Sequence, residues 1–217
     1  MKRTTRLVSI KNTPMVIFDA PECISDDIVK HNDFWEYALF HRWYQHFPKT
    51  GLMLDIGANI GSHCLQFKTN FPELEIWAFE PFLENYNVLI QNTKRYDDIK
   101  CFNVGVGSNT SVVTFNGGHE FNSGVVRMTP DGLFPNIVLA LDTLSFGDKK
   151  ISFIKIDVEG HELSAFEGMV DLIKEHKPVI WAEDHSKRAI PFLQELGYNI
   201  LEEELSTNDF LLACEKF

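Results

Sequence analysis

The sequence predicts an α/β fold built on a doubly wound, mostly parallel sheet, and two observations support this class. From residue 52 onward, short apolar segments alternate with longer amphipathic segments, as strands and helices do in α/β proteins. Several of the short segments are apolar on both faces, which is typical of parallel strands buried between two layers of helices. Such an order favours right-handed crossovers that return each strand to the same sheet.

The alternation defines the elements of the core. Helices are expected over residues 82–96 and 161–175, because apolar side chains recur there at helical spacing. These side chains are Phe82, Tyr86, Leu89 and Thr93 in the first helix and Leu163, Phe166, Val170 and Ile173 in the second. The strands are expected at residues 52–54, 76–79, 101–104, 153–156 and 179–182.

Two further elements are expected before this core begins. A β-hairpin is predicted from the apolar runs 7–10 and 15–18, which flank a turn that contains Pro14. Residues 33–47 are predicted to form a helix, because their apolar residues fall on one helical stripe. That stripe consists of Phe34, Ala38, Trp43 and Phe47.

Residues 111–144 interrupt the alternation and are expected to form inserted β-hairpins, since they are rich in Gly, Thr, Val and Phe. Residues 198–217 are expected to form a closing antiparallel hairpin. No internal repeat or flexible linker marks a boundary between domains. The sequence therefore predicts one domain over residues 1–217, with an N-terminal hairpin and helix in residues 1–48 and the core in residues 49–217.

The charge of the chain argues against two classes of partner. Its 217 residues include 20 Lys and Arg against 31 Asp and Glu, which gives a formal net charge of −11. Such a chain is repelled by phosphate backbones and anionic lipids, so we expect neither a nucleic-acid nor a membrane partner. The N-terminus lacks the apolar core of a signal peptide, and no long apolar run occurs. We expect a cytoplasmic protein with reduced thiols, whose oligomeric state the sequence leaves open.

A glycine-containing turn follows the first strand of the core. The segment DIGANIG places Asp55 at the end of this strand, with Gly57 and Gly61 in the turn that opens the next helix. The pattern lacks the middle glycine of the dinucleotide-binding fingerprint, which disfavours a nicotinamide dehydrogenase. Gly57 allows a ligand to approach the backbone closely. Asp55 is suited to accept a hydrogen bond from an ammonium or hydroxyl group, although an aspartate here can also cap the helix.

A second acidic residue ends the next strand. Glu80 follows Asp55 by 25 residues, and a carboxylate at this place suits bidentate hydrogen bonds to the two hydroxyls of a ribose. Taken alone, Glu80 would equally suit a solvated strand end. Together with Asp55 and the two glycines, at the carboxyl ends of neighbouring strands, it favours a ligand that contains ribose.

Five motifs, in this order, carry a resemblance to a known family: DIGANIGSH, AFEPFLENYNVL, NVGVGSN, LDTL and FIKIDVEGHELSAFEGM. They resemble class I S-adenosylmethionine-dependent methyltransferases of the FkbM type, over about residues 50–175. The resemblance implies a Rossmann-like fold with a seven-stranded sheet and S-adenosyl-L-methionine as cofactor. It also implies that the glycine loop holds the cofactor's amino-acid part, that Glu80 holds its ribose and that the third strand's end borders its adenine. The implied cofactor-binding residues are Asp55, Gly57, Ala58, Asn59, Gly61, Glu80, Pro81, Asn103, Val104 and Asp157.

Acidic residues also follow the fourth and fifth strands, whose ends lie side by side in a doubly wound sheet. This arrangement would gather at one rim the side chains of Asp157, Glu159, Glu183, Asp184, His161 and His185. So many carboxylates repel one another, and alternation along the strand is expected to point Lys155 away from Asp157 and its partners. Solvent screening or a divalent cation would relieve the repulsion, and oxygen ligands suit magnesium, manganese or calcium.

This rim is similar to the metal site of sugar O-methyltransferases that use magnesium. The resemblance implies that Asp157, Glu183 and Asp184 bind magnesium or manganese, and that the metal binds two sugar hydroxyls. A general base is expected just beyond Asp157, where Glu159 and His161 both qualify and the resemblance does not decide. Alternation along the strand favours Glu159, which lies two residues beyond Asp157, although Glu159 is also placed to cap the following helix.

Together these features predict an S-adenosylmethionine-dependent O-methyltransferase that acts on a hydroxyl of a sugar or glycan, assisted by a divalent metal. A hydroxyl is a poor nucleophile at neutral pH, so metal coordination and a general base would both promote its attack. Two alternatives stay open. One is a non-catalytic S-adenosylmethionine-binding module, which has no need of the acidic rim. The other is an RNA 2′-hydroxyl methyltransferase, which the net charge disfavours.

Overall fold

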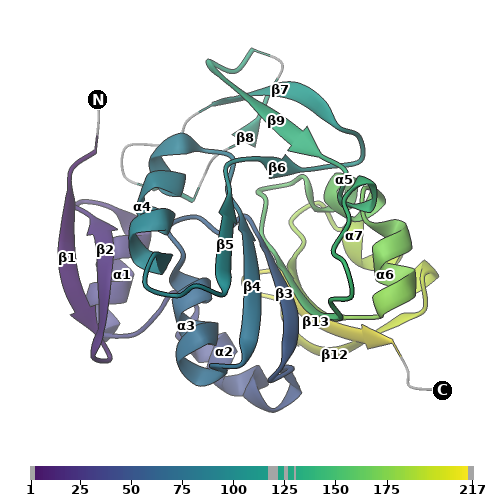
Figure 1. Ribbon diagram of the computed structural model, residues 1–217, viewed down its shortest axis with the longest axis horizontal. Helices are drawn as coiled ribbons and strands as arrows, with labels where there is room; N and C mark the ends of the chain where they lie inside the picture. The colour runs from purple at the N-terminus through teal and green to yellow at the C-terminus, as the bar shows by residue number, and fades with distance from the viewer. Residues whose placement is uncertain (1–2, 117–121, 125–126, 130, 215–217) are drawn as a thin grey trace.

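The computed structural model describes residues 3–116, 122–124, 127–129 and 131–214, and a seven-stranded sheet forms its centre (Figure 1). The strand order is β12-β13-β11-β10-β3-β4-β5, in which the five strands from β11 to β5 run parallel. β13 is antiparallel to both β11 and β12. The predicted sheet and closing hairpin are therefore confirmed. The strands are β3 (Gly51–Ile56), β4 (Leu74–Phe79), β5 (Ile99–Phe102), β10 (Ile151–Ile156), β11 (Val179–Glu183), β12 (Tyr198–Glu204) and β13 (Asp209–Cys214).

Alternation along the central strands builds two hydrophobic cores, one on each face of the sheet. On β3, Leu52 and Leu54 belong to the first core and Met53 to the second. On β10, Ile154 belongs to the first core and Phe153 to the second. Because the alternation continues to the carboxyl edge of the sheet, the second face ends in ionisable residues there. These residues are Asp55, Lys155, Glu183 and Asp209.

Helices cover both faces of the sheet, as a doubly wound fold requires. Three helices supply apolar side chains to the first core: α5 (Glu162–Glu167), α6 (Val170–His176) and α7 (Ala189–Glu195). Three others supply the second core: α2 (Tyr37–Trp43), α3 (Ser62–Asn70) and α4 (Leu83–Thr93).

The predicted N-terminal hairpin is confirmed, although Pro14, which was expected in its turn, lies in the second strand opposite Ser9. β1 (Thr5–Ile10) pairs antiparallel with β2 (Thr13–Phe18), and a helix that the sequence analysis did not predict, α1 (Cys23–His31), follows. Figure 1 shows the hairpin beside α4. The Asn92 side chain on α4 accepts a hydrogen bond from the N–H of Val16 at 2.6 Å and donates to its carbonyl at 2.9 Å. This contact ties the hairpin to the core.

The helix predicted over residues 33–47 is shorter than expected. α2 begins only at Tyr37 and is followed by a 3₁₀ turn, η1 (Tyr44–His46). Just before α2, Glu36 adopts a left-handed conformation with φ +57°, so no helix runs continuously from residue 33. Of the predicted apolar stripe, Phe34, Trp43 and Phe47 are buried as expected, whereas Ala38 is exposed.

The helix predicted over residues 161–175 is divided into α5 and α6. The break lies at Gly168, where a Cβ atom would be 1.9 Å from the carbonyl oxygen of Gly107. The chain from the small sheet thus passes against the helix backbone, and an unbroken helix with a side chain at this position would not fit. The helix predicted over residues 82–96 corresponds to α4.

A small second sheet lies beyond the carboxyl edge of the parallel strands (Figure 1). β7 pairs antiparallel with β8 and β9, as predicted for inserted hairpins, whereas β6 pairs parallel with β9. The LDTL motif forms a 3₁₀ turn, η2 (Leu141–Thr143). The strands are β6 (Gly105–Val106), β7 (Ser111–Asn116), β8 (Arg127–Met128) and β9 (Phe134–Leu139).

Parts of two predicted hairpins fall outside the described residues. These parts are residues 117–121, 125–126 and 130 of the insertion and residues 215–217 of the closing hairpin. Within the described ranges, each helix is either too short or too polar to traverse a lipid bilayer.

Candidate active site

A cavity opens at the carboxyl ends of β3, β4, β10 and β11, where open α/β sheets bind their ligands. Its walls come from the loops after these strands, from the segment before α2 and from the small sheet. The predicted site residues that line the cavity are Gly57, Ala58, Asn59, Glu80, Pro81, Asp157, Glu159, His161 and Glu183. The predicted site residues that do not line it are Asp55, Gly61, Asn103, Val104 and Asp184.

The glycine loop after β3 is fixed by the neighbouring strands. The N–H groups of Gly57 and Ala58 both donate to the carbonyl of Phe79 at the end of β4, at 2.9 and 3.0 Å. Gly57 has φ +82°, and a Cβ atom on it would lie 1.8 Å from the carbonyl oxygen of Asp157. Glycine is required here because this loop touches the loop after β10.

Two other residues of the motif contact the neighbouring helices. A Cβ atom on Gly61 would lie 2.7 Å from Leu89 Cδ1, so this glycine allows α4 to approach α3 closely. Asp55 is fully buried, and its Oδ2 accepts a hydrogen bond from Cys64 Sγ at 3.1 Å. Its Oδ1 has no hydrogen-bond partner among the described residues.

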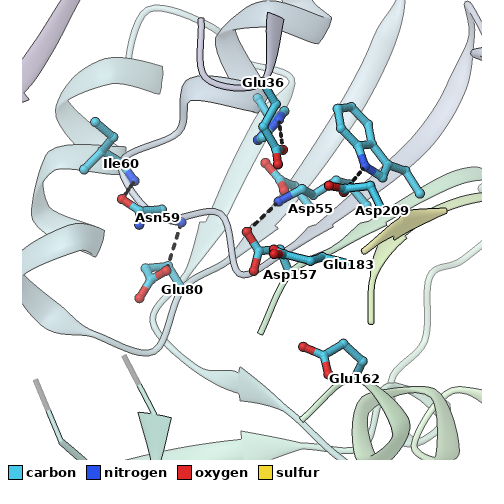
Figure 2. Close-up of polar contacts among 12 residues, drawn as sticks. Glu36, Asp55, Asn59, Ile60, Glu80, Asp157, Glu162, Glu183 and Asp209 are labelled. Atoms are coloured by element: carbon cyan, nitrogen blue, oxygen red, sulfur yellow. Dashed lines mark hydrogen bonds and ion pairs between the residues drawn. The ribbon is translucent and has the colours of Figure 1, made fainter. Parts of the chain in front are cut away.

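Glu80 is held as a fixed acceptor in the cavity wall (Figure 2). Its Oε2 accepts from the N–H of Asn59 at 2.9 Å, and its Oε1 accepts from the N–H of Phe82 at 2.8 Å. Burial raises the pKa of Glu80 to about 7, although both hydrogen bonds oppose this shift. Each carboxylate oxygen keeps a further lone pair, so the side chain can still accept from two hydroxyl groups.

Two asparagines hold the loops beside Glu80. The Asn103 amide donates to the carbonyls of Glu80 and Pro81, at 2.9 and 3.0 Å, and so fixes the loop after β4. Asn85 lines the cavity from α4 and donates to the carbonyl of Ser123 at 2.9 Å. The buried Oδ1 of Asn85 has no hydrogen-bond partner within the part of the chain described.

Lys155 lies at the centre of the acidic residues, which corrects the expectation that it points away from Asp157. Its Nζ is 3.2 Å from Asp157 Oδ2, and only 2% of the residue is exposed. Positions 155 and 157 are two residues apart, so alternation keeps them on one side of the sheet. Burial opposes the charge on Lys155, but neighbouring carboxylates outweigh burial and raise its pKa. These are the carboxylates of Asp157, Glu36, Asp55 and Glu183.

Asp157 and Glu183 share a hydrogen bond between the ends of β10 and β11, and Figure 2 shows them side by side. Burial opposes the charge on Asp157, but the Lys155 ammonium and the hydrogen bonds from Glu183 and Lys155 together outweigh burial and lower the Asp157 pKa. Burial and the Asp157 charge raise the pKa of Glu183, so Glu183 is the partner that carries the proton. Glu183 also contacts His185, whose Nε2 lies 2.7 Å from its Oε1.

The three residues predicted to hold a metal do not come together. Asp184 is turned toward the start of α7, where its carboxylate accepts from the Ser186 hydroxyl at 2.8 Å and the Ile190 N–H at 3.0 Å. Asp157 and Glu183 do meet, but the cation beside them is the Lys155 ammonium. Among the residues that the structure describes, no group of three or more His, Cys, Asp or Glu side chains is arranged to hold an ion.

Both candidate bases line the cavity from the loop after β10. The alternation argument for Glu159 does not apply, because β10 ends at Ile156 and Glu159 lies in a turn with φ +53°. The turn, rather than the strand, brings Glu159 to the cavity. His161 directly precedes α5.

Two ionisable residues of the cavity were missed by the sequence analysis. Glu36 Oε2 and His63 Nε2 lie 3.1 Å apart, and both side chains are largely buried. Burial raises the pKa of Glu36 to about 7 and lowers that of His63 to about 3, so His63 is uncharged at neutral pH. Glu36 comes from the turn before α2 and His63 from the first turn of α3. No motif spacing links the two positions, and the pairing is a product of the fold.

The N-terminal region and the insertion meet beside the cavity. Glu22 accepts a hydrogen bond from the Ser25 N–H through Oε2 and from the Ser123 N–H through Oε1, both at 2.8 Å. The first bond caps α1 and the second holds the insertion. Trp35 and Gly124, from the same two regions, line the cavity.

The comparisons with known proteins agree with this geometry. A family model described as "Methyltransferase FkbM domain" matches residues 55–203. "Hexuronic acid methyltransferase AglP" of Haloferax volcanii is 26% identical over 126 residues, which cover 57% of this chain and 52% of that protein. "Methyltransferase sdnD" of Sordaria araneosa is 29% identical over 136 residues, which cover 60% and 50%. The chain therefore spans about half the length of these two relatives.

Solved structures share the fold. The crystal structure of a methyltransferase FkbM from Methylobacillus flagellatus KT has a TM-score of 0.58 and 26% identity, over 77% of this chain and 44% of that one. A protein of the NADB-Rossmann superfamily from Streptococcus agalactiae has a TM-score of 0.51 and 14% identity, over 85% and 72%, which shows the fold alone. The expected Rossmann-like fold is thereby confirmed.

Proposed function

Because this chain belongs to the FkbM methyltransferase family, we propose that it transfers the methyl group of S-adenosyl-L-methionine to a hydroxyl oxygen of a sugar or glycan. The observation that carries the proposal is the Glu80 carboxylate, fixed by two backbone N–H groups beside the glycine loop. Asp157 and Glu159 belong to another wall of the same cavity. One cavity therefore offers a hydrogen-bond acceptor for the cofactor's ribose and groups suited to proton transfer.

The chemistry of the cavity fits the cofactor. Glu80 retains acceptor capacity for the ribose diol, and the loop from Gly57 to Asn59 would border the amino-acid part. The carboxylates of the cavity suit the positive charges of the ammonium and the sulfonium. When bound, S-adenosylmethionine supplies an electrophilic methyl group; the protein has to orient the acceptor toward it and remove a proton.

A sugar hydroxyl suits this cavity better than a hydroxyl on the phosphate-rich backbone of a nucleic acid. Among the described residues, its lining contains five carboxyl groups, those of Glu36, Glu80, Asp157, Glu159 and Glu183, against the single ammonium group of Lys155, which disfavours a polyanion such as a phosphodiester backbone. The net charge of −11 likewise disfavours a nucleic acid. A sugar acceptor is also supported by the relative named a hexuronic acid methyltransferase.

The proposed base is Glu159, with His161 as the alternative, since both line the cavity just beyond Asp157. The base removes the acceptor's hydroxyl proton while an oxygen lone pair forms the new bond to the methyl carbon. The carbon–sulfur bond breaks at the same time, and its electron pair stays on sulfur to give S-adenosylhomocysteine. No step of this scheme is assigned to a metal, because the three predicted ligands do not gather.

We also propose that residues 1–217 act as one methyltransferase domain. The N-terminal residues 1–48 contribute Trp35 and Glu36 to the cavity, while residues 49–217 contribute the glycine loop, Glu80 and the acidic rim. A cavity with walls from both parts supports this view.

A methyl-transfer assay with methyl-labelled cofactor tests the function. The acceptor panel contains neutral glycans, hexuronic acids and an RNA oligomer, and each labelled product is treated with mild base. A methyl ether survives this treatment, whereas a methyl ester is hydrolysed. Base-stable label on a glycan supports the proposal. Base-labile label would assign the methyl group to a carboxylate, and binding of S-adenosylhomocysteine without transfer to any acceptor would favour the non-catalytic module.

A further inference from the structure

We propose that the Lys155 ammonium group is the built-in cation of the acidic rim, and that it positions Asp157 and Glu183 where a divalent metal was expected. Lys155 is a positioning residue in this scheme, because it acts on the reaction through the carboxylates beside it. Only the activity measurements described below rest on the proposed function.

The sheet fixes the place of Lys155. β10 is paired on both sides, so that Lys155 lies beside Asp55 of β3 and Trp181 of β11 in register. Its side chain is 3% exposed, and its Nζ forms an ion pair with Asp157 Oδ2 at 3.2 Å. The backbone at Lys155 cannot shift without disturbing the pairing of β10 with both neighbouring strands.

A buried ammonium group needs anionic partners, because it has lost its hydration. Asp157, Glu36, Asp55 and Glu183 all lie close enough to Lys155 to interact with its charge. They come from β3, from the end of β11, from the loop after β10 and from the turn before α2. The ammonium therefore links elements that the chain brings together only in the folded state.

The same geometry disfavours a divalent ion. An ion bound to both Asp157 and Glu183 would lie next to the Lys155 ammonium, and the two cations would repel each other. The third predicted ligand, Asp184, is already bonded to Ser186 and Ile190. Asp157 thus already has a counter-ion in Lys155, and Asp184 already has hydrogen-bond partners of its own.

Lys155 can influence the reaction through Asp157. The Asp157 side chain is held by the ammonium, and its carbonyl touches Gly57 of the glycine loop. Glu159, the proposed base, follows two residues later in the same loop. Loss of the ammonium would therefore leave the Asp157 carboxylate uncompensated and loosen the loop on which Glu159 is carried.

Manganese binding tests the proposal without any acceptor. Paramagnetic resonance of free Mn²⁺ is followed with the wild type, Lys155→Ala and the double variant Lys155→Ala/Asp157→Asn, after circular dichroism has shown that each is folded. We expect no site in the wild type that depends on Asp157. Lys155→Ala should bind Mn²⁺ roughly tenfold or more tightly than the wild type does, because the cation that repels Mn²⁺ from the carboxylates is gone. The double variant should lose this gain.

Two results would overturn the proposal: Mn²⁺ binding by the wild type that Asp157→Asn abolishes, or equal Mn²⁺ affinity of folded Lys155→Ala and wild type. If Lys155→Ala fails to fold, Lys155→Met keeps the volume, and the same comparison is made with it. Absence of methyl transfer to every acceptor would count against the proposed function, but the Mn²⁺ titration would still decide the role of Lys155.

An activity comparison adds a readout that a merely structural role would not move. Once an acceptor has been identified, exhaustive chelation of divalent metal ions should leave wild-type turnover unchanged. Lys155→Met should lower kcat with little change in cofactor affinity, and Lys155→Arg, which keeps the charge, should recover part of the loss. Chelator-sensitive turnover, or equal kcat in Lys155→Met and Lys155→Arg, would argue against a positioning cation.

Discussion

Gly57 and Asp157 touch so closely that a single Cβ atom on the glycine would lie 1.8 Å from the aspartate's carbonyl oxygen. In addition, the Asp157 N–H donates to the Ile56 carbonyl at 3.0 Å. The loop proposed to hold the cofactor and the loop proposed to carry the base are therefore joined. A disturbance of one is expected to move the other.

Gly57→Ala should be far more damaging than the same change at a glycine with free space. Gly197 has a similar φ of +89°, and a Cβ atom there would meet nothing within 4 Å. Gly197→Ala should lower the free energy of unfolding by about 1–2 kcal/mol through backbone strain alone. Gly57→Ala should cost roughly 1–3 kcal/mol more, because the backbone of the neighbouring loop has to shift. Urea denaturation measures both, and equal losses would show that the close contact is unimportant.

Glu80→Gln should weaken cofactor binding while it leaves the fold intact. The amide keeps the shape of the carboxylate, but its NH₂ group would face one of the two backbone N–H donors, and a charged acceptor is lost. We expect S-adenosylhomocysteine to bind more weakly by about 1.5–3 kcal/mol, the usual worth of a hydrogen bond to a charged group. Calorimetry measures this. Glu84→Gln on α4, outside the cavity lining, serves as the control; wild-type affinity in Glu80→Gln would refute the assignment.

Glu159→Gln should slow methyl transfer and spare cofactor binding. Removal of a general base lowers turnover by roughly 10²–10⁴-fold. Single-turnover kinetics at saturating cofactor measure the loss, and calorimetry checks the affinity. His161→Ala is the matched comparison, since both residues line the cavity from one loop. If His161→Ala is inactive while Glu159→Gln remains fast, His161 is the base.

The stability of the protein should fall as the pH rises toward neutrality. Burial, followed by the charge of Glu36, raises the pKa of Asp209 to about 7 from an ordinary value of 3.8. The folded state thus holds this proton more tightly than the unfolded chain does. The contribution is fully present below the unfolded pKa and is lost as the pH rises through about 7. Between these limits one such group changes the free energy of unfolding by up to about 1.4 kcal/mol per pH unit.

Asp209→Asn tests this pH dependence. The amide cannot ionise, and its oxygen can still accept the 2.7 Å hydrogen bond from the Trp181 indole N–H. The slope of unfolding free energy against pH should become shallower in this variant, as measured by urea denaturation at several pH values. Asp148→Asn, an exposed position, should leave the slope unchanged. An unaltered slope in Asp209→Asn would place the titration elsewhere.

Local patterns were sufficient to predict the sheet, the glycine loop and the acidic strand ends, because each depends on residues close in sequence. The position of Lys155 could also have been predicted, since residues two apart along a strand lie on the same side of the sheet, and Asp157 follows Lys155 by two. Asp184 was harder to predict, because only the start of α7 shows where its carboxylate is engaged. Glu36 and His63 were not predictable, since their contact depends on a left-handed turn before α2 and on how that turn docks onto α3.

The hydrogen bond from the Ser123 N–H to the Glu22 carboxylate joins two segments of the chain that lie 101 positions apart. One stretch precedes the segment matched by the family model, and the other lies within it. In a chimera between two relatives, this hydrogen bond determines which segments have to be exchanged together. An insertion transferred alone would lack the Glu22 carboxylate that accepts its backbone hydrogen bond. The region around Glu22 and the region around Ser123 therefore have to be transferred together.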